Sequence, residues 1–167
     1  RIGYPVSWLG GDRQRYNTFG WEMASPAYEL RFSDRSLAWY DIAPMEIEEV
    51  LPDEAMATVE RLMDVPACHA IRPNLDHQIH RMDNRFFVNT DGYAILQGQG
   101  RDRIRISELV SASGNEVGWI RALLDWNFGS QATWQFSVWD RTRLGRLMPY
   151  AAEWMGAYPH MYRVNDL

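Results

Sequence analysis

The chain has 167 residues, of which 46% are hydrophobic, and a formal net charge of −5. This length and composition support one domain with a buried core, and the lack of any apolar run of about eighteen residues excludes a membrane-spanning helix. We expect a soluble protein with no visible leader peptide, although the chain starts at Arg1 and a removed leader stays open. The lone Cys68 excludes an internal disulfide and slightly favours a reducing compartment.

The charges are unevenly distributed, and every basic residue is an arginine. Residues 1–66 hold twelve acidic residues and six arginines, whereas residues 67–167 hold ten acidic residues and eleven arginines. This layout argues against nucleic-acid binding driven by phosphate charge over the whole surface. It suits head-to-tail contacts between protein subunits instead.

An irregular aromatic arm is predicted over residues 1–26, because six glycine and proline residues interrupt any regular period. Its aromatic content is too high for a disordered tail. We therefore expect the arm to lie against its own domain or a neighbouring molecule, with Trp8, Tyr16 and Trp21 as contact residues.

A hairpin followed by a helix is predicted next. Tyr28, Leu30 and Phe32 alternate with polar residues, which is typical of a half-buried strand. Residues 33–36 have turn chemistry, so residues 37–42 are expected to form the returning strand. Pro52 and the acidic residues after it favour a helix over residues 53–63.

A cluster of metal-ligating residue types occupies residues 68–83. His77 and His80 are three residues apart, so on a helix they would share one face, with Asp83 beside them as a catalytic candidate and His69 as a further metal ligand. The spacing matches neither a helical zinc motif nor paired cysteines. Surface or capping histidines are the simpler interpretation, and Cys68 next to His69 does not by itself make a thiolate–imidazole pair.

A β region is predicted over residues 85–107. Strands around residues 86–88 and 93–97 flank Asp91-Gly92, a strong hairpin signal because glycine takes positive φ without strain. Alternation over residues 103–106 predicts a third strand. Arg101, Arg103 and Arg105 form a stripe that either faces an anion or protects an exposed sheet edge.

A central helix is predicted over residues 115–127, because apolar side chains cover most of its circumference. Asn115 is the expected N-cap, and Arg121 with Asp125 forms an i, i+4 pair on the polar stripe. Residues 107–127 also allow a helix–turn–helix interpretation, but apolar residues occupy the face that would have to read bases.

The remaining chain is predicted to contain a strand at residues 132–138 and a last helix that starts at Asp140 or Thr142. Pro149 is expected to kink or restart this helix, which then runs to Met155. Residues 156–167 form a second irregular aromatic arm, with Tyr158 and Tyr162 as contact residues.

These elements predict a single α+β domain over residues 27–155, flanked by the two arms. Its antiparallel sheet of five or six strands would pack on the helix at residues 115–127, with two further helices alongside. No dinucleotide loop, nucleophile elbow, zinc motif or kinase signature is visible, which argues against an enzyme.

The leading functional hypothesis is therefore a non-catalytic subunit or adaptor of a larger assembly, which docks through its arms on protein partners or on copies of itself. One alternative is a small enzyme with a histidine and aspartate metal or acid–base site around residues 69–83. Another is a small-molecule binding module with an aromatic pocket. No cofactor is predicted, and nucleic acid is not an expected partner.

Overall fold

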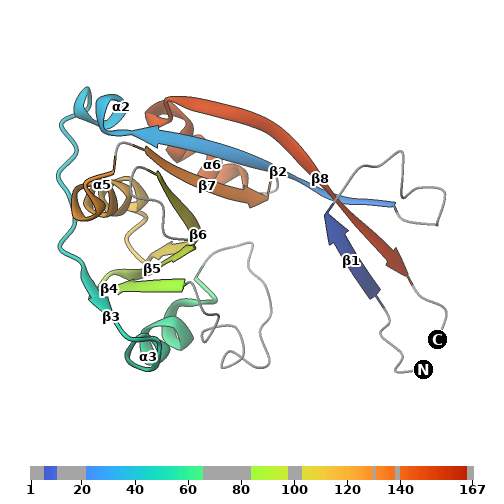
Figure 1. The fold of residues 1–167 in the computed structure, drawn as a ribbon, viewed down its shortest axis with the longest axis horizontal. Helices are drawn as coiled ribbons and strands as arrows, with labels where there is room; N and C mark the ends of the chain where they lie inside the picture. The colour runs from blue at the N-terminus through green and yellow to red at the C-terminus, as the bar shows by residue number, and fades with distance from the viewer. Residues whose placement is uncertain are drawn as a thin grey trace.

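The computed structural model describes six parts of the chain (Figure 1), namely residues 6–10, 22–65, 84–97, 103–129, 131–137 and 140–164. Within these parts one sheet contains eight strands: β1 (Val6–Gly10), β2 (Glu22–Ser33), β3 (Glu48–Val50), β4 (Asn84–Val88), β5 (Gly92–Gln97), β6 (Arg103–Ser111), β7 (Gln131–Ser137) and β8 (Glu153–Val164). The same described parts contain four α-helices and a 3-10 helix: α2 (Asp34–Ala38), α3 (Pro52–Leu62), α5 (Glu116–Asn127), α6 (Arg141–Leu147) and η2 (Met148–Tyr150).

The sheet is mixed. Its strand order is β1-β8-β2-β7-β6-β5-β4-β3, and all of these neighbours pair antiparallel except β6 and β7, which are parallel. Two parallel strands need a crossover connection, and α5 supplies it. The coarse prediction of a single α+β domain is confirmed, but the predicted antiparallel sheet of five or six strands lacked this parallel pair and the outer strands.

The parallel pairing of β6 with β7 covers only the first part of β6. The ladder runs from Arg103 opposite Gln131 to Ile106 opposite Trp134, whereas β6 continues to Ser111. The register against β5 shifts at the same place, because Ile106 lies opposite Leu96 and Glu108 opposite Ile95. This extra residue in β6 is a β-bulge, a feature that bends a strand locally.

Two hydrophobic clusters cover the two faces of the sheet. The larger one contains Trp119, Ile120 and Leu123 of α5, each with no exposed surface, together with inward residues of β2, β6 and β7. The smaller one packs α3 against the opposite side chains of β4, β5 and β6. Adjacent Phe86 and Phe87 show the separation of the faces, because they fall into different clusters.

The central helix has the predicted structure. Asn115 caps it by accepting a hydrogen bond from the Gly118 amide at 3.1 Å. Arg121 and Asp125 pair at 3.0 Å on its polar stripe. The helix–turn–helix interpretation is wrong, since residues 103–111 are the strand β6 rather than a first helix.

Two local predictions are wrong for identifiable reasons. Residues 33–36 start the helix α2 instead of a turn, because Ser33 and Ser36 form a reciprocal capping box, so no strand follows at residues 37–42. Pro149 lies in η2, after which the chain forms β8 rather than another helical turn. The boundaries of the arms at residues 26 and 155 stay predictions, but β2 runs across the first of them and β8 across the second.

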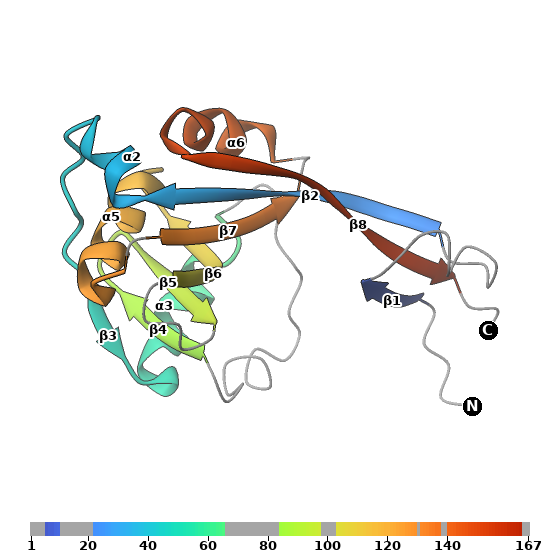
Figure 2. The same cartoon turned by 45° about the horizontal axis from the view of Figure 1, so that its top comes forward.

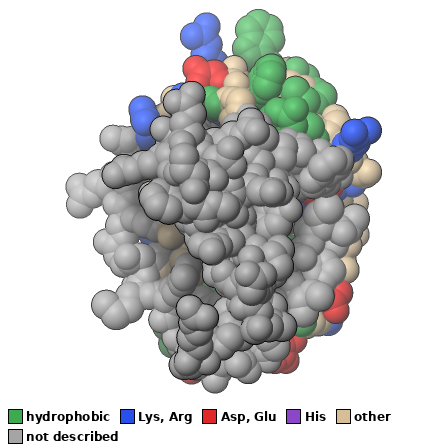
Figure 3. Space-filling view, turned by 90° about the vertical axis from the view of Figure 1, so that its right-hand side faces the viewer, with side chains coloured by type: hydrophobic (Ala, Val, Ile, Leu, Met, Phe, Trp, Pro, Cys, Tyr) green, Lys and Arg blue, Asp and Glu red, His purple; other side chains and the backbone are tan. Residues whose placement is uncertain are grey.

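The long strands β2 and β8 run together past the end of β7 toward β1 (Figure 2). On the face seen in Figure 3, described hydrophobic side chains gather at the upper edge, with arginine side chains beside them. Among the described residues, no helix has both the length and the apolar character that crossing a membrane requires.

The burial of α5 predicts a large cost for shortening one of its core side chains. Leu123→Ala should lower the free energy of unfolding by about 2–5 kcal/mol, because it leaves a cavity between α5 and the sheet. Leu51→Ala is the matched control, since Leu51 is 68% exposed and its truncation should change stability by less than about 0.5 kcal/mol. Urea denaturation followed by circular dichroism measures both, and similar losses for the two variants would contradict this account of the core.

Candidate functional site

The start of α5 lies where a ligand-binding site is expected in this kind of fold. In α/β units, ligands bind beyond the carboxyl ends of parallel strands, where the next helix presents unpaired N–H groups and the positive end of its dipole. Here β6 ends at Ser111, a short turn follows, and α5 begins at Glu116. Gly114 in this turn has a φ of 78°, in the left-handed region that favours glycine.

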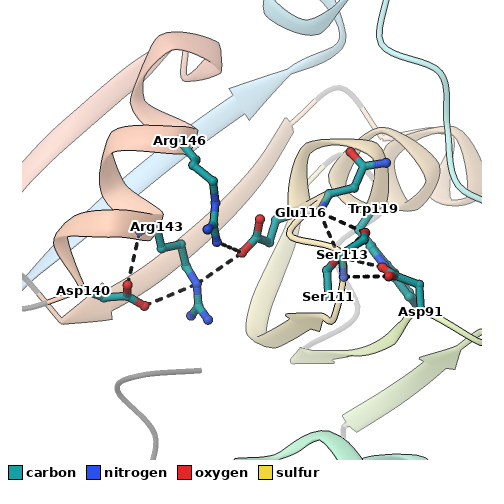
Figure 4. Close-up of polar contacts among 9 residues, drawn as sticks. Asp91, Ser111, Ser113, Glu116, Trp119, Asp140, Arg143 and Arg146 are labelled. Atoms are coloured by element: carbon teal, nitrogen blue, oxygen red, sulfur yellow. Dashed lines mark hydrogen bonds and ion pairs between the residues drawn. The ribbon is translucent and has the colours of Figure 1, made fainter. Parts of the chain in front are cut away.

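The carboxylate of Asp91 occupies this position (Figure 4). Its Oδ1 accepts a hydrogen bond from the Ser113 amide at 2.8 Å. Its Oδ2 accepts from the Ser111 hydroxyl at 2.6 Å and from the Trp119 indole N–H at 3.3 Å. The donors therefore come from the end of β6, from the turn and from the first part of α5, and all of them converge on one side chain.

The turn that carries Asp91 is itself fixed. The Asn89 side-chain oxygen accepts hydrogen bonds from the amides of Asp91 and Gly92, both at 2.8 Å. A Cβ on Gly92 would lie 2.0 Å from the carbonyl oxygen of Val110, so only glycine fits there. The prediction that Gly92 takes a positive φ is wrong, because among the described glycines only Gly114 does so. Glycine is needed at residue 92 because two strands approach each other closely there.

The environment of Asp91 favours its ionised form. Burial raises the pKa of this carboxyl group, but hydrogen bonds from Ser111, Ser113 and Trp119 together outweigh burial and leave the pKa below its ordinary value. Asp91 therefore carries a negative charge at neutral pH, next to the positive end of the α5 dipole.

A second carboxylate, Glu116, lies in the first turn of α5 and is buried, with a side chain only 3% exposed. Its Oε1 accepts a hydrogen bond from Arg146 of α6 at 2.6 Å and lies 3.6 Å from the Nε atom of Arg143. Arg143 also pairs with Asp140 at 3.3 Å and lies over the Trp134 ring, 5.2 Å from its centroid. This ion cluster joins α6 to the start of α5 (Figure 4).

Glu108 is the carboxylate on the part of β6 beyond the parallel ladder. It accepts a hydrogen bond of 2.5 Å from the hydroxyl group of Tyr93, a residue of the smaller hydrophobic cluster. Glu108 is thus held against the α3 side of the sheet.

An open recess with a volume of about 480 Å³ lies elsewhere, between α2 and η2. The rings of Tyr40 and Tyr150 meet edge to face at 4.7 Å, and the Tyr40 hydroxyl donates to the carbonyl of Pro149. Trp39 is 80% exposed at its rim. Both elements that form this recess were assigned wrongly from the sequence.

Most residues that the sequence singled out lie outside the described parts of the chain. This holds for the whole histidine cluster and for three of the predicted contact residues, that is Cys68, His69, His77, His80, Asp83, Tyr16, Trp21 and Arg101. The described residues contain no group of three or more histidine, cysteine, aspartate or glutamate side chains that could hold a metal ion.

The other predicted contact residues lie on strands. Trp8 of β1 pairs with Tyr162 of β8, and Tyr158 of β8 pairs with Ala27 of β2. Arg103 and Arg105 are exposed on β6, but β6 lies inside the sheet between β5 and β7. The interpretation of these arginines as protection for an edge strand is therefore wrong.

Sequence reasoning missed the residues that form the site. Asp91 enters the predictions only as part of a hairpin signal, and Glu116 has no predicted functional role. The Ser111-x-Ser113 pair shortly before the Asn115 cap indicates hydrogen-bond donors at a helix start, but the sequence does not show that Asp91 lies beside them.

Comparison with known proteins places the fold. No family model and no curated protein matches the sequence. The chain is similar to a GCN5-related N-acetyltransferase (GNAT) from Kribbella flavida, with 16% identity and a TM-score of 0.64 over 97% of this chain and 44% of that one. A probable N-acyltransferase from Enterococcus faecalis V583 gives 17% identity and a TM-score of 0.63 over 96% and 45%. A tandem GNAT protein from the clavulanic acid biosynthesis pathway gives 10% identity and a TM-score of 0.61 over 97% and 64%.

These likenesses show a GNAT-like fold. The chain spans less than half the length of the first two of these proteins and less than two thirds of the third. The hypothesis of a non-catalytic subunit or adaptor that docks through terminal arms is wrong, because the solved structures that share this fold include a GCN5-related N-acetyltransferase and a probable N-acyltransferase.

The Asp91 contacts predict a pH-dependent contribution to stability. A carboxylate with a lowered pKa in the folded state stabilises the fold above its ordinary pKa, and this stabilisation is lost as the pH falls through the folded-state value. Asp91→Asn should therefore lower the free energy of unfolding by about 1 kcal/mol or more at neutral pH, with a difference from the wild type that shrinks toward pH ~3.

Urea denaturation over this pH range measures that difference. Glu48→Gln on the exposed strand β3 is the control, since it makes the same change from carboxylate to amide without removing a described hydrogen bond. A loss for Asp91→Asn that does not change with pH would contradict the assigned role of its charge.

The buried ion cluster predicts a difference between two arginines of α6. Arg143→Ala should lower the free energy of unfolding by about 2 kcal/mol or more, because it removes a cation next to buried Glu116 and its contact with Trp134. Arg141→Ala is the control at an exposed position two residues earlier. Thermal denaturation of both variants measures the effect, and equal stability would show that the cluster does not need Arg143.

Proposed function

We propose that this chain is one fold unit of an N-acetyltransferase, an enzyme that moves an acetyl group from a thioester to the nitrogen of an amine. The observation that carries the proposal is the β6–α5–β7 unit, with its short parallel ladder, inside a GNAT-like fold. Two solved structures with this fold over at least 96% of the chain are an N-acetyltransferase and a probable N-acyltransferase. Because the chain spans less than half of their lengths, we assign the activity to a longer polypeptide that contains this unit.

The reaction sets clear chemical requirements. A carbon–nitrogen bond forms and a carbon–sulfur bond breaks, while the amine loses a proton and the departing thiolate gains one. Such a reaction needs a group that accepts the amine proton and donors that stabilise the negative charge on the carbonyl oxygen.

The described carboxylates near the parallel pair already have other contacts. Glu108 accepts from Tyr93, Asp91 accepts from the start of α5, and Glu116 pairs with the arginines of α6. We therefore assign none of them as the proton acceptor, and the chemistry is proposed for the enzyme as a whole.

The test is an assay of the purified polypeptide that contains this chain. With acetyl-coenzyme A and a panel of primary amines, including an aliphatic amine, an aromatic amine, free lysine and a peptide N-terminus, we expect thiol release together with an acetylated amine in the mass spectrum. Reactions without the amine report hydrolysis of the thioester and serve as the control. A folded protein that acetylates no amine in the panel would contradict the proposal.

A further inference from the structure

We propose that Asp91 is a built-in ligand of the anion site at the start of α5, so that this fold unit does not hold the phosphates of an acyl donor there. The inference rests on the proposed function, because acetyl transfer raises the question of where acetyl-coenzyme A would bind. Acetyl-coenzyme A carries a diphosphate and a further phosphate group, so its binding site must offer N–H groups or cations. The residues at the start of α5 do not fit this requirement.

The anion site itself has the usual form. A twelve-residue helix follows a parallel strand, and its first turn presents the positive end of the helix dipole at the carboxyl end of that strand. In an α/β unit this is the ordinary position for a bound phosphate. A phosphate here would take its hydrogen bonds from the turn at residues 111–115 and from the beginning of α5.

Those donors already have acceptors inside the chain. The Ser113 amide, the Ser111 hydroxyl and the Trp119 indole donate to Asp91 at 2.8, 2.6 and 3.3 Å. The amides of Asn115 and Gly118 are also used, since Asn115 N donates to the Ser111 hydroxyl oxygen and Gly118 N to the Asn115 side chain. A phosphate could use these donors only by displacing Asp91 and the other acceptors.

The charge around the turn opposes a second anion. Asp91 is ionised at neutral pH, because its hydrogen bonds outweigh the effect of burial on its pKa. Glu116 adds a buried carboxylate in the same helical turn. The cations that could offset a phosphate, Arg143 and Arg146, lie against Glu116 at 3.6 and 2.6 Å.

Asp91 is also held by its backbone, so its position does not depend on the side-chain contacts alone. Its carbonyl accepts a hydrogen bond from the Ala112 amide at 2.8 Å, and its own amide donates to Asn89. The close contact of Gly92 with Val110 fixes the same turn from the other side. The turn between β4 and β5 is thus joined to the turn between β6 and α5 at several points.

The test follows the donors directly in the full chain labelled with ¹⁵N. Inorganic pyrophosphate, and separately acetyl-coenzyme A, are added to millimolar concentration while the amide signals of Ser113 and Gly118 and the indole signal of Trp119 are recorded. We expect no saturable shift of these three signals in the wild type. A saturable shift of all three would overturn the proposal.

Asp91→Ser provides the complementary measurement, because it removes the charge and frees the Ser113 amide. We expect pyrophosphate to shift the same signals in this variant, with an affinity at least about tenfold higher than in the wild type. Glu48→Gln is the control and should behave as the wild type. If Asp91→Ser does not fold, Asp91→Asn keeps the size of the side chain and removes the charge. If neither the wild type nor a folded Asp91 variant responds, Asp91 is not the group that closes the site.

The outcome is separable from that of the proposed function. Amine acetylation by the whole polypeptide with no response at the α5 turn supports both proposals. Acetylation together with a saturable shift at the turn overturns only the present one. A lack of acetylation with no response at the turn overturns only the assignment of the enzyme.

Discussion

The parallel pairing of β6 with β7 is the constraint on which the rest of the structure depends. Parallel neighbours require a crossover, and the crossover must cover one face of the sheet, so α5 has to be apolar toward β2, β6 and β7 together. Trp119, Ile120 and Leu123 meet this requirement. The other face packs against α3, and the described strands beyond β7, namely β2, β8 and β1, are joined by antiparallel pairs.

The same crossover helix also needs hydrogen-bond acceptors and negative charge at its first turn. A helix start brings unpaired N–H groups and a positive dipole end into a partly buried position, where they need acceptors. This chain supplies those acceptors from its own residues, since Asp91 accepts a hydrogen bond from the Ser113 amide and Asn115 caps the helix. Glu116, buried in the same turn, needs cations in return, and α6 supplies them through Arg143 and Arg146. The Asp91 hydrogen bonds therefore join two turns, and the Glu116 ion pairs join two helices.

The elements that a local sequence pattern defines were predicted correctly. The predictions were wrong where the same local pattern is compatible with two different structures. The apolar circumference and the Asn115 cap identified α5, alternation identified β6 and β7, and the Asp91-Gly92 hairpin signal identified β5. Residues 33–36 could not be assigned locally, because a serine cap and a turn use the same hydrogen-bonding chemistry. The β6 arginines show the wider reason for failure. Only the strand order decides whether they lie at an edge, and the strand order depends on pairings far apart in the sequence. The contacts of Asp91 with residues 111–119 are hidden for the same reason.

The structure also shows why a shared fold does not by itself assign a donor site. The GNAT-like fold here is set by strand order and by the apolar faces of α3 and α5, which would keep their form with many different polar residues in the turns. Phosphate binding at the start of α5 depends instead on whether a few N–H groups remain available. One aspartate at the tip of the neighbouring hairpin changes that condition without changing any strand. For this chain, the contacts of Asp91 are therefore a better indicator of phosphate binding at the start of α5 than the similarity of the whole fold.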